Sequence, residues 1–453
     1  MAYSQKEAHM KKVLLVVAAA VTFVSAQTYT NDSLAVRAIL AANGLSFLTV
    51  DNVTATSGSR IVRLNLSDLN LSSLTFPAAT ADLTALEWVN LDNNFMGSFP
   101  TGIEVLTWLD TLLFANNILG SVSSALGSLS SLKYLDLSTN QLSTLSSSIG
   151  GCTDLVGLRL NGNMLSSLPE ELWSLTSLQY LDLSDNDLGT LSASLGNFTQ
   201  LKKFLVSNSS LFALPDELSS CTVLEELNVN ENALSAIDPV SSLTALTTLS
   251  CANNAITALP NLGGLTLLDY IDCSNNQIAA VPASIGSTAL SRMNMSDNLI
   301  TTLPDEINAL APVYLCDFAG NKLCSLSCEA KTWLDNFDYD WESSQDTSGC
   351  PTCTGIEQNA AAGKEGILVA PNPFNPAVVI SIEKIFAGTG RDQSLHTIYI
   401  VIYDIHGRMI TDLSNHVING IVTWDASTQP AGVYVIRARI NGKTHIARAM
   451  LVK

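Results

Sequence analysis

Histidine, basic residues and charge in general are scarce in this sequence. Only 14% of its 453 residues are charged, and 22 lysines and arginines are outnumbered by 41 aspartates and glutamates. A net charge of −19 argues against binding DNA or RNA by neutralising phosphates. Residues 10–395 contain no histidine, so this long segment holds neither a Ser–His or Cys–His nucleophile nor a histidine-rich metal site.

An apolar run of about 18 residues, the length that a membrane-spanning helix needs, is also missing. The run at residues 13–24 is about 12 residues long, follows Lys11 and Lys12, and leads into the small-residue site Val24-Ser25-Ala26. This pattern indicates a secretory signal peptide at residues 1–26, with a membrane anchor as the alternative. We therefore predict an exported protein with no transmembrane segment in the mature chain, whose cysteines meet an oxidising environment.

Charge changes sharply along the chain. Residues 27–354 hold 10 basic and 33 acidic residues, whereas residues 355–453 hold 9 and 7. Such a step marks a domain boundary. Residues 355–365 are small and polar, and we interpret them as the linker between the two domains.

A repeating pattern occupies the middle of the chain. Segments of the form LxxLxLxxNxL, such as Leu178-QYLDLSDNDL, recur mostly every 22 or 23 residues. The alternation in each segment places Leu181 and Leu183 on one face of a short strand and Tyr180 and Asp182 on the other. The twelve copies begin at Ile61, Leu86, Leu109, Leu132, Leu155, Leu178, Leu201, Leu224, Leu246, Leu268, Leu290 and Val313.

This segment, at about residues 61–323, resembles the leucine-rich repeat family. The resemblance implies an α/β solenoid, a horseshoe whose parallel sheet forms the concave face, in which each coil contacts only its neighbours. A buried asparagine amide at the end of each strand has the donors and the acceptor to bond the backbone of neighbouring turns. These asparagines are Asn140, Asn163, Asn186, Asn232, Asn254, Asn276, Asn298 and Asn321. Two copies depart from the pattern, with Leu69 and Ser209 in the asparagine position; for Ser209 we favour a tolerated hydroxyl over a local distortion.

Open solenoid ends need covers. Residues 27–60 form the expected N-terminal cap, with Asn31-Asp32-Ser33 capping a helix that runs to about Ala42 and Gly44 stopping it. Residues 324–354 form the expected C-terminal cap, which is similar to the cysteine-bearing caps of secreted leucine-rich repeat proteins.

The nine cysteines fall into groups with different expected roles. In the C-terminal cap, export favours disulfides over a zinc site, and the pairing stays open. The four disulfide candidates are Cys324, Cys328, Cys350 and Cys353. Cys251 and Cys273 take an inward strand position in adjacent repeats, as buried hydrophobes or as a cross-repeat disulfide. Cys316 is expected in the core.

The outward strand positions make the candidate binding surface. The third position of the repeats carries Arg63, Trp88, Tyr134, Tyr180, Tyr270 and Tyr314, and the fifth carries, among others, Asp136, Arg159, Asp182 and Asp272. Aromatic rings beside acidic groups are typical of recognition surfaces, and Arg159 between two aspartates predicts a charge ladder. A merely solvated face is the main alternative, and a calcium site between neighbouring carboxylates is a weaker one.

Catalysis is not expected. Asp136 and Asp182 are two repeats apart, about 10 Å, which overlaps the separation in inverting glycosidases, but a ladder of strands gives that spacing automatically. We predict no enzyme activity, no cofactor and no metal site.

The tail changes to short alternating strands, about seven in 90 residues, which suggests a small all-β, Ig-like sandwich at residues 366–453. It resembles the C-terminal sorting domain of the bacterial type IX secretion system. The matching pieces are PNPFNP at 371–376, IYDIHGR at 402–408, WD at 424–425, AGVY at 431–434 and the terminal ARAMLVK. The resemblance implies contact with the secretion machinery and passage across the outer membrane; an ordinary adhesion module is the alternative.

The sequence as a whole predicts an exported bacterial repeat protein, secreted or displayed at the cell surface. Its concave face is expected to bind a macromolecule. A protein ligand is favoured, and a polysaccharide is the alternative.

Overall fold

The structure is a computed structural model that describes residues 25–310, 313–324, 326–338, 341–345, 366–370, 377–383, 398–404, 408–414, 421–440 and 443–451. Most of the predicted signal peptide, the linker, the PNPFNP motif, Cys350 and Cys353 lie outside these residues. The chain divides into two compact units at residues 246 and 247, and each is described by itself.

The first unit begins with helices α2 (Ser25–Ala42) and α3 (Val50–Val53) and an antiparallel hairpin of β1 (Thr54–Ser57) and β2 (Arg60–Asn65). Short parallel strands follow, one per repeat. They are β3 (Trp88–Asn90), β4 (Thr111–Leu113), β5 (Tyr134–Asp136), β6 (Gly157–Arg159), β7 (Tyr180–Asp182), β8 (Lys203–Leu205) and β9 (Glu226–Asn228).

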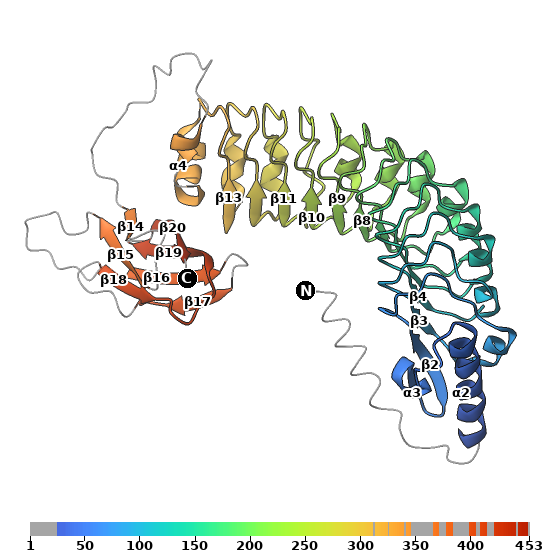
Figure 1. Ribbon diagram of the computed structural model, residues 1–453. Helices are drawn as coiled ribbons and strands as arrows, with labels where there is room; N and C mark the ends of the chain where they lie inside the picture. Colours follow the sequence, from blue (N-terminus) through green and yellow to red (C-terminus); the bar gives the residue numbers. More distant parts are fainter. Residues whose placement is uncertain are drawn as a thin grey trace, which may run out of the picture. The chain divides into compact units, whose positions relative to one another are not determined.

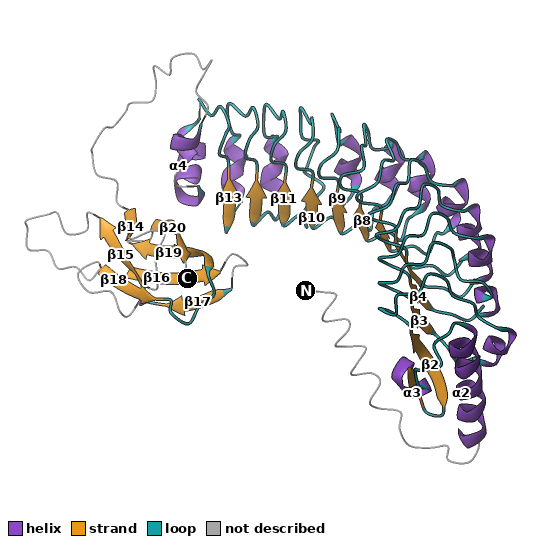
Figure 2. Cartoon of the chain, in the orientation of Figure 1, coloured by secondary structure: helices purple, strands orange, loops and turns teal. Residues whose placement is uncertain are grey.

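A short 3-10 helix on the returning arm alternates with these strands. These helices are η1 (Ala78–Asp82), η2 (Ile103–Val105), η3 (Ser124–Ser128), η4 (Ser147–Gly151), η5 (Glu170–Ser174), η6 (Ala193–Asn197), η7 (Asp216–Ser220) and η8 (Asp238–Ser242). Within the unit the strands line one side of the coil and the helices the other (Figure 2).

The second unit continues the repeats with β10 (Thr248–Ser250), β11 (Tyr270–Asp272), β12 (Arg292–Asn294) and β13 (Leu315–Asp317), and with η9 (Ala283–Ser287) and η10 (Asp305–Ala309). The strands follow one another in chain order, from β1 to β13 (Figure 1). The predicted solenoid with a parallel sheet is therefore confirmed.

The core of each coil consists of the leucines that the pattern predicts to point inward. In the sixth repeat Leu178, Leu181 and Leu183 have no exposed surface and Leu188 is 4% exposed. In-register parallel pairing, such as Leu181 opposite Phe204, stacks the same position of successive coils. Burial of a leucine side chain contributes about 1.5–3 kcal/mol, and each coil gains it only from its neighbours.

The predicted asparagine ladder is also confirmed. The side-chain amide of Asn186 donates to the carbonyl oxygens of Leu160 in the preceding coil (3.1 Å) and Leu183 in its own (2.9 Å). Its oxygen accepts the backbone N–H of Leu165 at 3.0 Å. Each asparagine thus ties two coils together where the chain turns away from the sheet.

The turn after each strand has one shared conformation. The eighth position of every repeat has a left-handed backbone, with φ between 48° and 68°, and is an asparagine, aspartate or glycine in most repeats. These residues are Asp68, Asn93, Asn116, Thr139, Gly162, Asp185, Asn208, Glu231, Asn253, Asn275, Asp297 and Gly320. Asparagine, aspartate and glycine tolerate this conformation best.

The two repeats without the asparagine differ from the rest. Asn70 in the first and Ser210 in the seventh also have positive φ, 56° and 57°. The hydroxyl of Ser209 lies 3.0 Å from the carbonyl oxygens of Leu183 and Ser207, the positions that the amide reaches elsewhere. The seventh repeat therefore shows a tolerated hydroxyl together with a local distortion of the turn.

The start of the N-terminal helix was predicted wrongly. Helix α2 begins at Ser25, so Asp32 lies inside it instead of capping it. The Asp32 carboxylate is 1% exposed and accepts Nε of Arg60 at 2.9 Å and the N–H of Ile61 at 2.8 Å. This long-range contact fastens the helix to β2. The end of the helix at Ala42 and the left-handed Gly44 (φ 71°) are as predicted.

Helix α4 (Cys328–Phe337) and η11 (Trp341–Ser344) follow the last repeat. Trp333 is buried, with its ring centroid 6.4 Å from that of Phe318. The Asp338 carboxylate accepts the N–H of Phe318, and the side-chain oxygen of Gln345 accepts the N–H of Leu323 at 3.1 Å. Gln345 thereby takes the place that an asparagine of a further coil would have.

Cys152, Cys221, Cys251 and Cys273 are buried thiols, and Cys316 is buried in the core as predicted. Burial raises the pKa of Cys152 to about 12 and that of Cys221 to about 11. The sulfurs of Cys251 and Cys273 lie 3.3 Å apart as thiols, so they are buried hydrophobes and not a disulfide. In the cap, Cys324 is disulfide-bonded.

The tail forms two antiparallel sheets. One has the order β14 (Gly366–Ala370), β15 (Ala377–Glu383), β18 (Ile421–Asp425), and the other β17 (Met409–Asp412), β16 (Ile398–Asp404), β19 (Gly432–Ile440), β20 (Lys443–Leu451). Ile380, Ile402, Trp424 and Ile436 belong to one buried cluster that both sheets contribute to. The Trp424 and Tyr434 rings meet edge to face at 5.0 Å. A small all-β domain is as predicted.

Candidate functional site: the sheet face of the repeats

Neighbouring strands pair in register, so residues at the same repeat position line up across the sheet. We call such a line of residues a column. Parallel pairing places Arg63 beside Trp88, and the same column continues through Tyr134 and Tyr180; in the second unit it contains Tyr270. Tyr314 is not in this column, because Arg292 pairs with Leu315. Tyr314 lies one residue before β13, and its 39% exposed side chain is at the second position of its repeat.

We call the third and fifth positions of β2–β13 the sheet face. Its centre is a chain of charged and aromatic groups on β5–β7. The Arg159 guanidinium lies 3.4 Å from the Asp136 carboxylate and 5.3 Å from the centroid of the Tyr180 ring. The Tyr180 hydroxyl donates to Asp182 at 3.3 Å. The predicted ladder exists from Asp136 to Arg159, and Tyr180 links it to Asp182.

Tyr180 is held as a neutral phenol. Burial, and then the nearby Asp182 carboxylate, raise the pKa of Tyr180 to about 12. The hydroxyl therefore stays a hydrogen-bond donor at any physiological pH. Cations on both sides hold the ring, since the Lys203 ammonium also lies 6.0 Å from its centroid. Cation–aromatic contacts of this kind contribute about 0.5–1 kcal/mol at exposed sites.

Four residues of the site were not predicted from the sequence: Gly157, Lys203, Glu226 and Arg292. All occupy the third position, in β6, β8, β9 and β12, so the complete third-position column contains them. Lys203 and Glu226 form an ion pair at 2.8 Å. None of the four is aromatic, whereas five of the six residues predicted for this position are.

Gly157 creates a notch between two tyrosines. A Cβ atom on this residue would lie 2.9 Å from Cδ1 of Tyr134 and 4.0 Å from Cβ of Tyr180. The Tyr134 ring therefore lies across the glycine, where any other side chain would displace it. Tyr134 is still 48% exposed, so one side of its ring remains open to a ligand.

The same combination recurs elsewhere on the sheet face. In the second unit, the Arg292 guanidinium lies 5.0 Å from the Tyr270 ring centroid and 2.7 Å from Asp269, and the Tyr270 hydroxyl donates to Asp272 at 3.4 Å. Near the start of the first unit, Arg63 lies 5.4 Å from the Trp88 ring centroid. Each aromatic ring is thus oriented by a cation and stays partly exposed.

Asp92 lies two residues after β3, at the edge of the sheet face. Its carboxylate accepts the N–H of Ala115 at 2.6 Å. Burial raises the pKa of Asp92 to about 6, against the opposing effect of this hydrogen bond, and the carboxylates of Asp136 and Asp68 add to the rise. Burial, more than the neighbouring carboxylates, therefore makes this carboxyl group easier to protonate than an ordinary aspartate.

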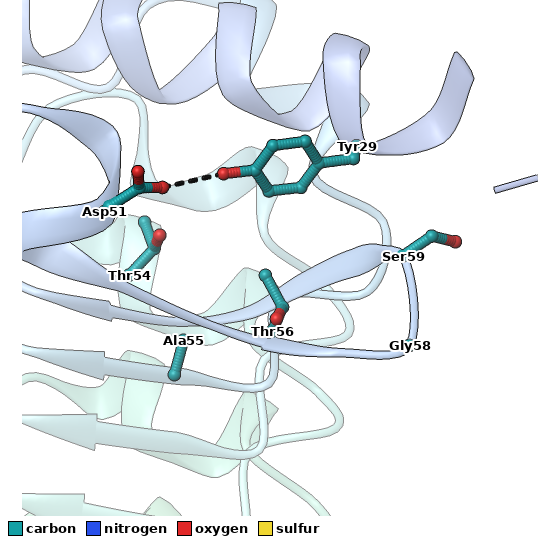
Figure 3. A pocket seen from close by; sticks show the side chains of 7 residues that line it. All are labelled: Tyr29, Asp51, Thr54, Ala55, Thr56, Gly58 and Ser59. Carbon is teal, nitrogen blue, oxygen red and sulfur yellow. Dashed lines mark hydrogen bonds between the residues drawn. The ribbon is translucent and has the colours of Figure 1, made fainter. Parts of the chain in front are cut away.

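A separate pocket of about 470 Å³ lies at the N-terminal hairpin (Figure 3). Tyr29 donates to Asp51 at 2.8 Å above strand β1, and Thr54, Thr56 and Ser59 add hydroxyl groups. No feature of the sequence pointed to it, since its residues come from α2, α3 and the hairpin. Apart from the Tyr29 ring, its lining consists of small and polar residues, so it offers mainly hydrogen bonds to a ligand.

The described residues hold neither a metal-ligand cluster nor a membrane-spanning helix. These ranges contain no cluster of three or more histidine, cysteine, aspartate or glutamate side chains placed to hold a metal ion. In the same ranges no helix is both long and apolar enough to cross a membrane.

Family models match two parts of the chain. Models described as "Leucine Rich Repeat" and "Leucine Rich repeats (2 copies)" match residues 131–152, 177–198, 222–264 and 244–286. A model described as "Secretion system C-terminal sorting domain" matches residues 368–453. No curated protein matches the sequence.

Solved structures with the same solenoid are numerous. An internalin from Listeria monocytogenes has 23% identity and a TM-score of 0.52, over 69% of this chain and 88% of the internalin. The plant peptide hormone receptor RGFR1, solved with RGF2, has 32% identity and a TM-score of 0.52 over 57% of this chain. The Arabidopsis receptor kinase HAESA, solved with the peptide hormone IDA and the co-receptor SERK1, has 28% identity and a TM-score of 0.53 over 60%.

The chain spans less than half the length of the two plant receptor chains, 44% and 48%. The repeat pattern, the stacked coils and the family models agree with one another along the middle of the chain, and so do the strands and the family model at its end. The chain carries a leucine-rich repeat domain followed by a secretion system C-terminal sorting domain.

Proposed function

We propose that this is an exported binding protein whose sheet face holds an extended segment of a partner protein. The observation that carries the proposal is the set of partly exposed aromatic rings on the sheet face, each fixed by a charged neighbour: Trp88 by Arg63, Tyr180 by Arg159, and Tyr270 by Arg292. Rings that are already oriented lose little conformational entropy on binding, so they favour affinity.

The spacing of the rings suits an extended peptide that crosses the strands. Tyr134 and Tyr180 are two strands apart, which is about 10 Å at the spacing of sheet strands. About three residues of extended chain cover that distance. A peptide side chain that stacks on the open side of Tyr134 would be followed by one near Tyr180 and Arg159.

Charge favours a segment that is neutral or basic. Within the described sheet face, Arg159, Lys203 and Arg292 each have a carboxylate partner within 4 Å. Residues 61–246 hold 5 basic and 19 acidic residues, so negative charge is in excess. An acidic ligand would be repelled, and a basic one attracted over about a Debye length.

The comparisons support a peptide ligand. The two plant receptors with 32% and 28% identity were solved with peptide hormones. The sorting domain match supports export to the cell surface or the medium, and we propose that residues 366–453 direct passage across the outer membrane. We propose binding and not catalysis as the activity of the repeats, because the carboxylates on β5–β7 are engaged by Arg159 and Tyr180.

A peptide library tests the proposal. The mature chain, immobilised, is used to select peptides from a random displayed library, and it is also applied to a glycan array. We expect selected peptides whose binding falls at least about tenfold in Tyr134→Ala and Tyr180→Ala. Phe47→Ala, an equally large truncation of a 74% exposed ring on the N-terminal cap, is the matched control and should bind normally. Selection of no peptide, together with a glycan hit lost in the tyrosine variants, would favour a polysaccharide ligand instead.

A further inference from the structure

A second surface of the first unit carries exposed apolar side chains. We call it the C-terminal flank: the seventh, eighth, tenth and twelfth positions of the first eight repeats, which follow the C-terminal ends of β2–β9. Four large apolar residues of this flank are exposed: Phe95 (56%), Ile118 (45%), Met164 (56%) and Phe212 (63%). They are separate from the sheet face, because they come after the turn at the eighth position.

Small residues in the preceding coils let these side chains lie along the surface. A Cβ atom on Gly97 would be 3.9 Å from Cδ1 of Ile118, and one on Gly189 would be 3.7 Å from Cε2 of Phe212. Each ring or branched chain therefore covers the glycine of the coil before it. The exposed apolar groups lie in the second, third, fifth and seventh repeats, with the exposed polar Gln141 and Asp187 between them. Exposed apolar groups gathered on one flank mark a candidate binding surface.

The flank contains a pocket of about 430 Å³ beside Met164. It is lined by Asn163, Met164, Ser166, Asp185, Asn186, Asp187 and Asn208. Asp185 and Asp187 are both exposed, and Asp185 accepts the side-chain amide of Asn208 at 2.9 Å. The pocket lies next to the seventh repeat, where Ser209 replaces the asparagine and Ser210 takes a left-handed conformation.

The flank carries negative charge and no positive charge. Its thirty-two positions include five acidic residues, Asp68, Asp92, Asp185, Asp187 and Glu231, and neither lysine nor arginine. At the opposite edge, the second positions carry lysines beside acidic residues, and Lys133 and Lys202 pair there with Asp110 and Glu225. Apolar groups beside uncompensated carboxylates are complementary to a segment that combines apolar and basic side chains.

We propose that the C-terminal flank is a second docking surface, which takes a basic, amphipathic segment of a partner protein. Apolar side chains of the segment pack on Met164 and Phe212, and a lysine or arginine enters the pocket between Asp185 and Asp187. A charged-lipid surface is a poor occupant, because anionic headgroups would be repelled by the same carboxylates. The surface is independent of the sheet face.

Model peptides test this inference on the full mature chain. The probe is a fluorescent peptide of about twelve residues that alternates lysine and leucine; the comparison peptides replace lysine by glutamate, or leucine by serine. We expect the lysine–leucine peptide to bind at least about tenfold more tightly than either comparison peptide. Equal binding of all three, or no binding of the lysine–leucine peptide, would overturn the proposal.

Matched variants separate docking from general attraction to an acidic protein. Met164→Ser with Phe212→Ser, and Asp185→Asn with Asp187→Asn, should each weaken binding about tenfold. The controls remove the same groups elsewhere: Leu34→Ser with Phe47→Ser on the cap, and Asp216→Asn with Glu217→Gln on η7. Tyr180→Ala should leave this binding unchanged, which distinguishes the flank from the sheet face. If the controls weaken binding as much as the flank variants do, the attraction is nonspecific and the proposal fails.

Discussion

Single side chains join the coils of this solenoid. Asn186 satisfies two buried carbonyl groups and one buried N–H group from two successive coils. A buried polar group left without a partner costs about 1–3 kcal/mol. The asparagine position therefore matters more for stability than its small share of the core volume suggests.

Replacing Asn186 by alanine should lower the free energy of unfolding by about 2–4 kcal/mol, because several buried backbone groups lose their partner at once. Urea unfolding followed by circular dichroism measures the change. Gln141→Ala, at an exposed tenth position, is the control and should change the free energy by less than about 0.5 kcal/mol. A similar loss in both variants would contradict the role given to the ladder.

Gly157→Ala tests how the sheet face is shaped. The new methyl group would lie 2.9 Å from the Tyr134 ring, so the ring must swing away. Because the ring is the far end of a flexible side chain, we expect a stability change below about 1 kcal/mol. Affinity for a selected peptide should nevertheless fall severalfold. Gly120→Ala, which meets no atom within 4 Å, should change neither property. Unchanged peptide affinity in Gly157→Ala would show that the notch has no role.

The raised pKa of Asp92 makes the folding stability depend on pH, and the direction of the change follows from the sign of the shift. Burial raises its folded-state pKa to about 6, above its ordinary 3.8, so the folded protein holds this proton more tightly than the unfolded chain does. Stability should therefore fall as pH rises from about 4 to about 6, and the loss stays at higher pH.

Asp92→Asn removes this loss and keeps an acceptor for the N–H of Ala115. It should stabilise the protein at pH 7 by about 1 kcal/mol, after allowance for partial solvent screening, and by nothing at pH 3.5. Thermal unfolding at several pH values checks this. Asp154→Asn, at an exposed carboxylate, should show no such pH-dependent gain, and equal behaviour of the two variants would rule out burial as the cause.

At the residue scale, the sequence predicted which residues lie on the sheet face better than it predicted which neighbours their side chains touch. The columns containing Tyr134, Asp136 and Arg159 follow from a short periodic pattern, so they could be predicted. The position of the Tyr134 ring over Gly157 could not, because it depends on a neighbour one repeat away. Tyr314 was misplaced by one position, since the weak copy that begins at Val313 has few leucines to fix its register.

At the scale of the element, the repeats were predictable and the cap was not. Strand and turn recur because local residue types demand them, twelve times over. The N-terminal helix was expected to begin near Asn31, because Asn-Asp-Ser is a frequent capping sequence. Asp32 instead bonds Arg60 and Ile61, about thirty positions along the chain, and a local pattern carries no sign of this contact.

Asp32→Ala should release helix α2 from β2. The change leaves the buried N–H of Ile61 without an acceptor and the Arg60 guanidinium without its carboxylate. We expect a loss of about 2–3 kcal/mol in unfolding free energy, and faster amide hydrogen exchange over residues 25–65 than over the central repeats. Uniform exchange along the whole first unit would show that the contact does not hold the cap locally.

At the scale of the whole molecule, an acidic repeat domain is joined to a sorting domain of nearly balanced charge. The sorting domain was recognisable because several short motifs occur in a fixed order, although some of them lie outside the described residues. The ligand was not recognisable, because exposed positions of a solenoid are free of the constraints that the core imposes.

Deleting residues 366–453 should leave the protein inside the outer membrane, because the proposed export address is removed. Immunoblotting of periplasm and medium measures its distribution. A point variant that keeps the tail, such as Tyr180→Ala, is the control and should be exported normally. The truncated protein in the medium at normal levels would contradict the role given to the tail.

Photo-cross-linking from the sheet face shows whether a polypeptide partner binds there. A photoreactive amino acid replaces Tyr134 in one variant and Glu171, an exposed residue on η5, in another, and both exported proteins are irradiated in their native surroundings. We expect a covalent adduct to a polypeptide from position 134 and none from position 171. An adduct from position 171 alone, or an adduct from position 134 that contains glycan and no polypeptide, would contradict this expectation.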